Sequence, residues 1–360
     1  MEQFLELVAK LPELQQLFSS VQGGLPCSLL RVAKELRQHL LHLLFEKTGR
    51  DVFYITSSEY HARRASEAYI YPERIFLPGP QAELRPVEAQ SAETRHNRVQ
   101  AIDRLHQKGG VVFASLDTLL FKMRPPEKFF AQYITLNESM EISPQKLLNR
   151  LAKAGYEYAP LIESVGQISG RGEMVEVFAP GFAQPLRITF FDEEIESIRL
   201  FDADSQRSFG GNLREANIPP AHEFALDAQE TALMLEYFRN SQTTKLEGIR
   251  ETYLLSLEEN GSFPNIEAYM DLLTEKVSIL DYAKAPFDDC SAMMGEQKTR
   301  IDSRAAMFGE ILADDSAFGC EMLYLWDAEE FLERNKQLLI DVEGLQPYRL
   351  FANASQIDFH

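Results

Sequence analysis

Two glycines, a cysteine and a serine near the start of the chain lie where a phosphate-binding loop could be. Gly23 and Gly24 follow one predicted helix, and Cys27 and Ser28 precede a second, longer one. A working loop ends in Gly-Lys-Ser/Thr, because the lysine neutralises phosphate charge and the hydroxyl binds magnesium. Here Cys27 stands in the place of the lysine, and Pro26 lacks an N–H that could donate to phosphate. The segment is therefore either a plain glycine turn with Ser28 as helix cap or a degenerate phosphate loop. Both interpretations predict no ATP hydrolysis at this site.

A predicted strand over residues 186–191 carries an unusual pair on its polar side. Alternation places every second residue on one face, so that Arg187, Thr189 and Phe191 point away from the apolar core. Arginine beside a large aromatic residue is typical of protein–protein hot spots. Arg171, just before the preceding strand, could reach the same face. The alternative is that a neighbouring loop covers Phe191, because alternation often fails at the end of a strand.

Composition and charge narrow the function classes. The 360 residues include 36 Lys+Arg and 55 Asp+Glu, which gives a net charge of −19. Such a charge repels polyanions, so it argues against a protein that mainly grips nucleic acid, although it leaves room for a local basic patch. The balance favours a protein partner or a small ligand.

Three features of the sequence bear on the cellular compartment of the protein and on metal binding. Cys27, Cys290 and Cys320 are widely spaced, which indicates reduced thiols and a cytoplasmic protein. The seven histidines show no metal-ligand spacing, so no metal site is predicted. The first residues are acidic where a signal peptide would be basic, and no apolar run is long enough to cross a membrane.

The chain divides into three blocks of different pattern. In the first, strands alternate with helices, which predicts a parallel α/β sheet. Its predicted strands are 52–56, 74–77 and 111–114, and its helices are 2–18, broken at Pro12, 28–49, 61–68 and 94–107. The second block is an α+β unit with a helix that starts at Ser143-Pro144 and strands 133–136, 174–178, 186–191 and 195–201. The third is mainly helical, with a capping box at Asp227 and Glu230 and strand candidates at 277–280 and 322–325.

The second block resembles a known domain. The run from Gly166 to Phe178, the run from Pro185 to Arg199 and the Phe201-Asp202 and Ser205–Ser208 segments are similar to the second domain of UvrB and of the transcription-repair coupling factor (Mfd) family. Ile218-Pro219-Pro220-Ala221-His222-Glu223-Phe224 resembles the coupling factors more than UvrB. The resemblance is strong over about 155–224 and weak beyond about residue 240.

The resemblance implies an architecture. The expected fold class is α/β, with a degenerate RecA-like (P-loop-like) first domain split in two parts by an inserted α+β UvrA-binding domain. The implied boundaries are 1–128 and 216–342 for the two parts of the first domain, 129–215 for the inserted domain, and 343–360 for a linker toward domains that are absent. The polar residues past Gly344 and the missing motor motifs together imply an N-terminal fragment.

The resemblance also implies a function. In the family the second domain docks UvrA and recruits excision repair to a stalled RNA polymerase. The matching UvrA-binding positions are Arg171, Arg187 and Phe191, with the arginines expected to pair with acidic groups and Phe191 expected to be the apolar anchor. Arg187→Ala or Phe191→Ala is expected to abolish UvrA binding and leave the fold intact. The implied fragment needs no cofactor, whereas the motor domains of the whole protein use ATP and magnesium, push along double-stranded DNA and displace RNA polymerase. A C-terminal domain of the family contacts the UvrA-binding surface.

Two alternatives stay open. One is a UvrB-type helicase subunit that binds ATP and damaged DNA, against which Cys27 speaks, as does the lack of a dense aromatic run over residues 71–86. The other is a structural role, in which the module holds the motor of the full-length protein at rest; this can coexist with UvrA docking.

Overall fold

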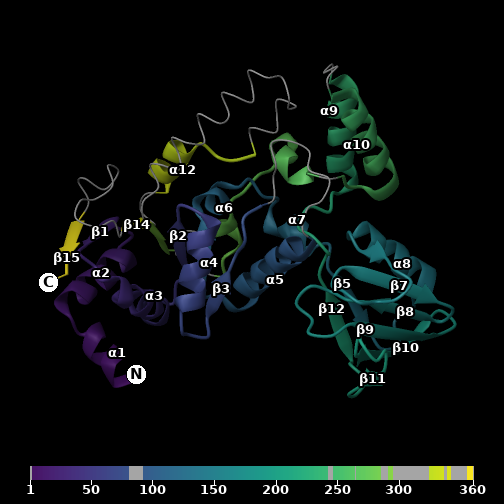
Figure 1. Cartoon of the computed structure of the whole chain (residues 1–360), viewed down its shortest axis with the longest axis horizontal. Helices are drawn as coiled ribbons and strands as arrows, with labels where there is room; N and C mark the ends of the chain where they lie inside the picture. The colour runs from purple at the N-terminus through teal and green to yellow at the C-terminus, as the bar shows by residue number, and fades with distance from the viewer. Residues whose placement is uncertain are drawn as a thin grey trace.

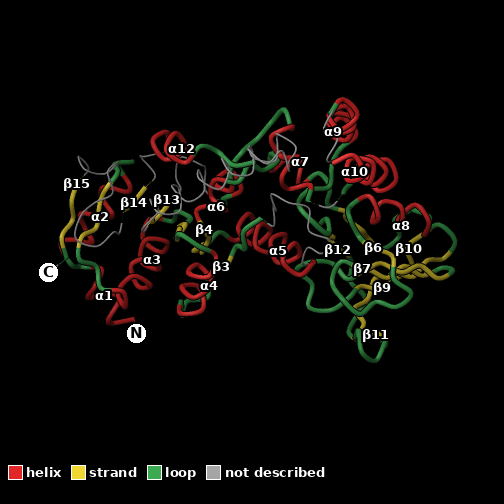
Figure 2. The backbone as a smooth tube through the Cα atoms, turned by 45° about the horizontal axis from the view of Figure 1, so that its top comes forward, coloured by secondary structure: helices red, strands yellow, loops and turns green. Residues whose placement is uncertain are grey.

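The computed structural model describes residues 2–80, 92–241, 246–263, 265–284, 291–294, 324–335, 339–341 and 355–359. The described residues form a seven-stranded and a six-stranded β-sheet, which lie toward opposite ends of an elongated molecule (Figures 1 and 2), and a two-stranded pair. Helix α1 (Glu2–Ala9) and strand β15 (Ser355–Asp358) lie at the same end (Figure 1).

The larger sheet has seven strands in the order β15-β1-β14-β13-β2-β4-β3. Besides β15, its strands are β1 (Cys27–Leu30), β2 (Val52–Thr56), β3 (Arg74–Phe76), β4 (Val111–Ser115), β13 (Ser291–Met294) and β14 (Leu339–Asp341). All of its described pairings are parallel, which confirms the prediction for the first block. Strands that precede residue 116 thus pair with strands that follow residue 290, and the chain between them is inserted into this sheet.

Helices cover both faces of this sheet. Val52 and Phe113 pack with α2 (Pro12–Gln22) and α3 (Lys34–Thr48) on one face, whereas Phe53 and Val112 pack with α5 (Ala92–Lys108) and α6 (Leu116–Leu120) on the other. Because successive strand residues point to opposite faces, strands buried on both sides read as continuous apolar runs. Helix α4 (Glu59–Ala68) connects β2 to β3.

One predicted helix begins too early. Residues 28–33 were expected to open the long helix, but Cys27–Leu30 form strand β1 and the helix begins at Lys34. The expectation that Ser28 caps the helix is therefore wrong. Short apolar runs are ambiguous between helix and strand, and here the backbone of residues 27–30 pairs with β15 on one side, and that of Cys27 and Ser28 with β14 on the other.

The third block departs from its prediction in two places. The candidate strand 277–280 is instead an isolated bridge between Val277 and Met123, followed by the 3-10 helix η3 (Ile279–Tyr282). Ser278 caps that helix and fixes its start. Of the candidate strand 322–325, the first two residues lie outside the described residues, and Leu325 forms only a bridge with Phe121.

The inserted unit has its own core. Its six-stranded sheet, in the order β11-β10-β9-β8-β7-β6, packs against helix α8 (Pro144–Lys153). The strands are β6 (Glu157–Tyr158), β7 (Gln167–Arg171), β8 (Met174–Val177), β9 (Leu186–Phe191), β10 (Glu194–Phe201) and β11 (Ser208–Phe209), and the pair β5 (Ile134–Asn137) with β12 (Glu215–Ile218) closes the unit. Ser143 caps α8 with Pro144 in its first turn, as predicted.

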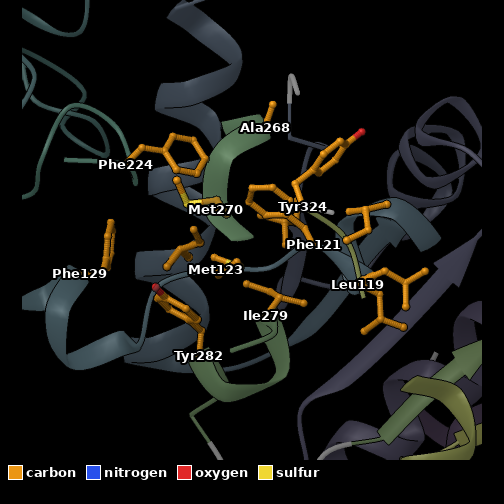
Figure 3. Close-up of a cluster of buried hydrophobic side chains, with 14 of the residues drawn as sticks. Leu119, Phe121, Met123, Phe129, Phe224, Ala268, Met270, Ile279, Tyr282 and Tyr324 are labelled. Atoms are coloured by element: carbon orange, nitrogen blue, oxygen red, sulfur yellow. The ribbon is translucent and has the colours of Figure 1, made fainter. Parts of the chain in front are cut away.

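Residues on both sides of the insertion share one core. Phe121, Met123 and Phe129 come from the chain before the inserted sheet, and they pack with Met270 and Tyr282 from the chain after it (Figure 3). This part contains α7 (Pro126–Phe130), α9 (Ala228–Asn240), α10 (Glu247–Asn260), the 3-10 helix η2 (Ile266–Leu272) and α12 (Ala328–Arg334). The predicted capping box of Asp227 and Glu230 is confirmed at the start of α9.

Two histidine–glycine contacts join the inserted unit to the rest. A Cβ atom at Gly166 would overlap the ring of His96 in α5, and one at Gly155 would overlap the ring of His222. Both glycines have φ of +90°, so each is needed for conformation as well as space. Burial lowers the pKa of His96 to about 4 and that of His222 to about 3, with Arg95 adding repulsion in both cases.

Candidate protein-binding site

One face of the inserted sheet carries the predicted site. The opposite face packs on α8, where Gly170 makes room for the Leu148 side chain. Cross-strand partners share a face, so the register shows which residues lie together. Arg171 pairs with Met174, Met174 with Thr189, and Thr189 with Ser197, which places all four on the face away from α8.

Phe191 is the most exposed large apolar residue in the part of the chain that the structure describes. Its exposed fraction is 76%, while Leu186, Ile188 and Phe190 on the same strand are buried. The predicted alternation of this strand is therefore confirmed. The alternative, that a loop covers Phe191, does not hold. Phe191 ends β9 opposite Glu194, and the two-residue turn between them contains Asp192 at φ +59°.

Arg187 is held by its own domain. It lies directly opposite Glu176 on the neighbouring strand, and its guanidinium contacts that carboxylate at 2.6 Å. The same guanidinium donates to Ser208 Oγ at 3.0 Å and to the Gln206 carbonyl oxygen at 3.2 Å, and it lies 4.4 Å from the centre of the Phe201 ring. Four of its neighbours thus fix the side chain before any partner arrives.

Arg171 is the more accessible arginine. It is exposed at the end of β7, beside the Gly172 turn, and donates a hydrogen bond to the Pro160 carbonyl oxygen. Strand spacing places it about 10 Å from Thr189, two strands away, and Phe191 lies about 13 Å from Arg187 along β9. The three predicted residues therefore share one face, but they form a broad surface and no closed cluster.

The surroundings of Phe191 are acidic. Asp192, Glu193, Glu194 and Glu196 are exposed on the β9–β10 hairpin, and Glu173 is exposed beside the β7–β8 turn. An apolar side chain ringed by carboxylates favours a partner with an apolar pocket bordered by cations.

Sequence reasoning missed the residues that hold Arg187. Glu176 could have been found, because it is the lone acid in the apolar strand 174–178 beside a strand with a lone arginine. Phe201 is buried although it lies on the polar face, where Arg187 covers it. Gln206 and Ser208 approach Arg187 through a loop whose path the sequence does not indicate.

The degenerate phosphate-loop residues are not placed as a loop between strand and helix. Gly23 and Gly24 end helix α2, and Cys27 and Ser28 are buried in β1. The connection from β1 to α3, where a phosphate loop would lie, is only the three residues 31–33. There Arg31 forms an ion pair with Asp358 of β15, with Nε and Oδ1 2.6 Å apart.

Among the described residues no group of three His, Cys, Asp or Glu side chains could hold a metal ion. In the same part of the chain no helix is long and apolar enough to span a membrane. Cys27 is buried in β1, and Cys290 and Cys320 lie outside the described residues.

Comparison with known proteins points to one family. Residues 134–224 match the UvrB interaction domain. The chain is 26% identical over 289 residues to the transcription-repair-coupling factor of Bacillus subtilis (strain 168), a match that covers 75% of this chain and 24% of that protein. It is 30% identical over 136 residues to the transcription-repair-coupling factor of Escherichia coli (strain K12), covering 38% and 12%.

The resemblance to the coupling factors is confirmed. The segment that matches the UvrB interaction domain contains the whole polar face with Arg171, Arg187 and Phe191. The chain spans about a quarter of the length of the Bacillus protein, so its likeness concerns one region of these relatives.

Proposed function

We propose that this chain docks UvrA through the polar face of its UvrB interaction domain. The observation that carries the proposal is Phe191, a large apolar side chain that is 76% exposed on a hydrogen-bonded strand. Exposed apolar groups on rigid elements cost little entropy to bind, and aromatic anchors supply much of the energy of an interface.

The three site residues have different roles in this proposal. Phe191 inserts into an apolar pocket of UvrA, and the carboxylates of Asp192 and Glu194 meet cations at its border. Arg171 pairs with an acidic group. Arg187 is a positioning residue, because its guanidinium already binds Glu176 and donates hydrogen bonds to Gln206 and to Ser208 at the start of β11.

The biological role follows from the relatives. The transcription-repair-coupling factor of Bacillus subtilis matches three quarters of this chain, which supports a role in bringing excision repair to a stalled RNA polymerase. ATP-driven movement on double-stranded DNA, contact with RNA polymerase and masking of the UvrA surface by a C-terminal domain belong, in this proposal, to the whole protein. The cytoplasm is the proposed location.

The proposal assigns no ATPase activity to this chain. The β1–α3 connection has three residues, whereas a phosphate loop of the Gly-x-x-x-x-Gly-Lys-Ser/Thr type needs about eight. The split parallel sheet supports a RecA-like first domain that has lost this loop. No described feature favours the UvrB-type helicase. The purified chain with magnesium and ATP should release no phosphate above the buffer rate, and steady turnover would revive the helicase.

The docking test compares two exposed apolar residues. Phe191→Ala should abolish co-elution with purified UvrA and leave the melting temperature unchanged. Leu255→Ala, which removes a 56% exposed side chain from α10, should do neither. Equal binding by the wild-type chain and the Phe191 variant would contradict the site, and absence of binding by the wild-type chain would contradict the function.

A further inference from the structure

A cavity of about 670 Å³ lies between helices α3 and α4, above strands β2 and β4. This volume is in the range of small-ligand sites. The two helices lie next to each other on the larger sheet, far from the polar face of the inserted unit (Figure 1). The UvrA-docking proposal does not use this cavity.

The floor of the cavity is aromatic. Tyr54 of β2 and Phe113 of β4 have ring centres 5.8 Å apart, and Tyr69 lies 5.2 Å from Phe113. Tyr60, at the start of α4, is 64% exposed at the border of the cavity. Flat π-surfaces of this kind stack on planar rings, and such stacking does not depend on a particular base.

The walls carry positive charge. Lys34 and Arg37 come from α3 and Arg64 from α4, against one acid, Glu35. Arg37 reaches the Tyr54 hydroxyl at 3.5 Å, and Arg64 reaches the Tyr60 hydroxyl at 3.4 Å, so both guanidinium groups lie at the aromatic surface. In a chain of net charge −19, this is a local site for an anion.

Gln38 adds an unused acceptor. Its Oε1 atom is shielded from solvent and accepts no hydrogen bond from the described residues. A shielded amide oxygen without a donor costs free energy, and the cost is recovered when a ligand supplies the donor. The exocyclic amine of adenine is such a donor.

The position of the cavity also fits a ligand site. Helix α3 follows β1 and helix α4 follows β2, so the first turns of both helices lie at the carboxyl edge of the parallel sheet. Lys34 and Tyr60 come from these first turns, and the cavity continues along α4 past Arg64 to Ala68. Open α/β sheets bind ligands at this edge.

We propose that the cavity between α3 and α4 binds an adenine mononucleotide without a metal ion. The base stacks on Tyr54 and Tyr60, its amine donates to Gln38, and Lys34 and Arg64 bind the phosphate. This inference goes beyond UvrA docking, and binding at this place involves no phosphate loop and no hydrolysis.

The test is calorimetric titration of the full chain with AMP in EDTA. AMP should bind, while adenosine and inorganic phosphate alone should each bind more weakly, because the site combines stacking with charge. Arg64→Ala should weaken AMP binding about tenfold, as expected for loss of one charged hydrogen bond. Gln38→Leu should reduce the preference for AMP over IMP, which lacks the amine.

The matched control is Arg63→Ala. Arg63 is the neighbour of Arg64, carries the same charge and lies over Phe76 outside the cavity. AMP affinity should be unchanged in this variant. Absence of saturable AMP binding, a requirement for magnesium, or an equal loss in the Arg63 and Arg64 variants would each overturn the proposal. A thermal melt of each variant confirms that the fold is kept.

Discussion

The guanidinium of Arg187 lies directly opposite the carboxylate of Glu176 on the neighbouring strand, with a nitrogen–oxygen distance of 2.6 Å. Glu176 is almost fully buried, so this pair belongs to the interior of the domain as well as to its surface. From the sequence, Arg187 was expected to contact the partner directly. Its ion pair with Glu176 indicates that Arg187 instead supports the surface that contacts the partner.

Arg187→Ala should destabilise the inserted unit. It leaves the buried Glu176 carboxylate without its cation, a change that costs about 3 kcal/mol in comparable pairs. The double variant Glu176→Leu with Arg187→Ala should lose much less than the sum of Glu176→Leu and Arg187→Ala measured separately. Urea unfolding followed by circular dichroism measures both effects. Additive losses would show that the pair is not coupled. This outcome differs from the expectation, based on sequence, that Arg187→Ala leaves the fold intact.

Arg171→Ala should weaken UvrA binding mainly through the association rate. Arg171 is exposed at the border of the surface, where charges guide the encounter more than they stabilise the complex. Rates measured on immobilised UvrA at several salt concentrations should show a smaller salt dependence for this variant. Arg150→Ala removes an exposed arginine from α8, on the other side of the same unit, and serves as the control. Equal salt dependence of both variants would argue against a role for Arg171.

Gly170→Ala should destabilise the packing of α8 on the sheet. An added Cβ would overlap a methyl group of Leu148, and overpacking of this kind costs about 1–3 kcal/mol. When residue 148 is already alanine, Gly170→Ala should cost less stability than it does in the wild-type chain. Gly211→Ala, where an added Cβ meets nothing within 4 Å, should be nearly neutral. Thermal melts compare the wild-type chain with four variants: Gly170→Ala, Leu148→Ala, the double variant and Gly211→Ala.

Acid should loosen the junction at His222. Burial lowers the pKa of His222 from the usual 6.5 to about 3 in the folded chain. Below about pH 6.5 the imidazole of His222 is therefore protonated in the unfolded chain but stays neutral in the folded chain. The free energy of unfolding falls as the pH drops further. The slope from this one residue is about 1.4 kcal/mol per pH unit. Urea unfolding between pH 7 and 5 should show a smaller decrease for His222→Gln; parallel curves would contradict the assignment.

The parts that could be predicted from sequence are those set by local rules. The alternation of residues 186–191 is strict, so the outward direction of Phe191 could be predicted. The helix caps at Ser143 and Asp227 could also be predicted, because each cap involves only residues up to three positions further along the chain. Strand β1 was misassigned because its four residues pair with strands more than 300 residues further along. The contacts of Arg187 with Gln206 and Ser208 depend on a loop conformation that no local pattern encodes.

The position of β1 between β14 and β15 has a consequence for synthesis of the chain. The ribosome makes β1 early, but its two neighbours emerge about 300 residues later, which takes roughly 15–60 seconds at usual rates of translation. The inserted unit, whose sheet and core use only its own residues, is complete well before then. The inserted unit can therefore fold before the last strands of the first domain have been synthesised. On a growing chain, the surface around Phe191 is ready for a partner before the parallel sheet is closed.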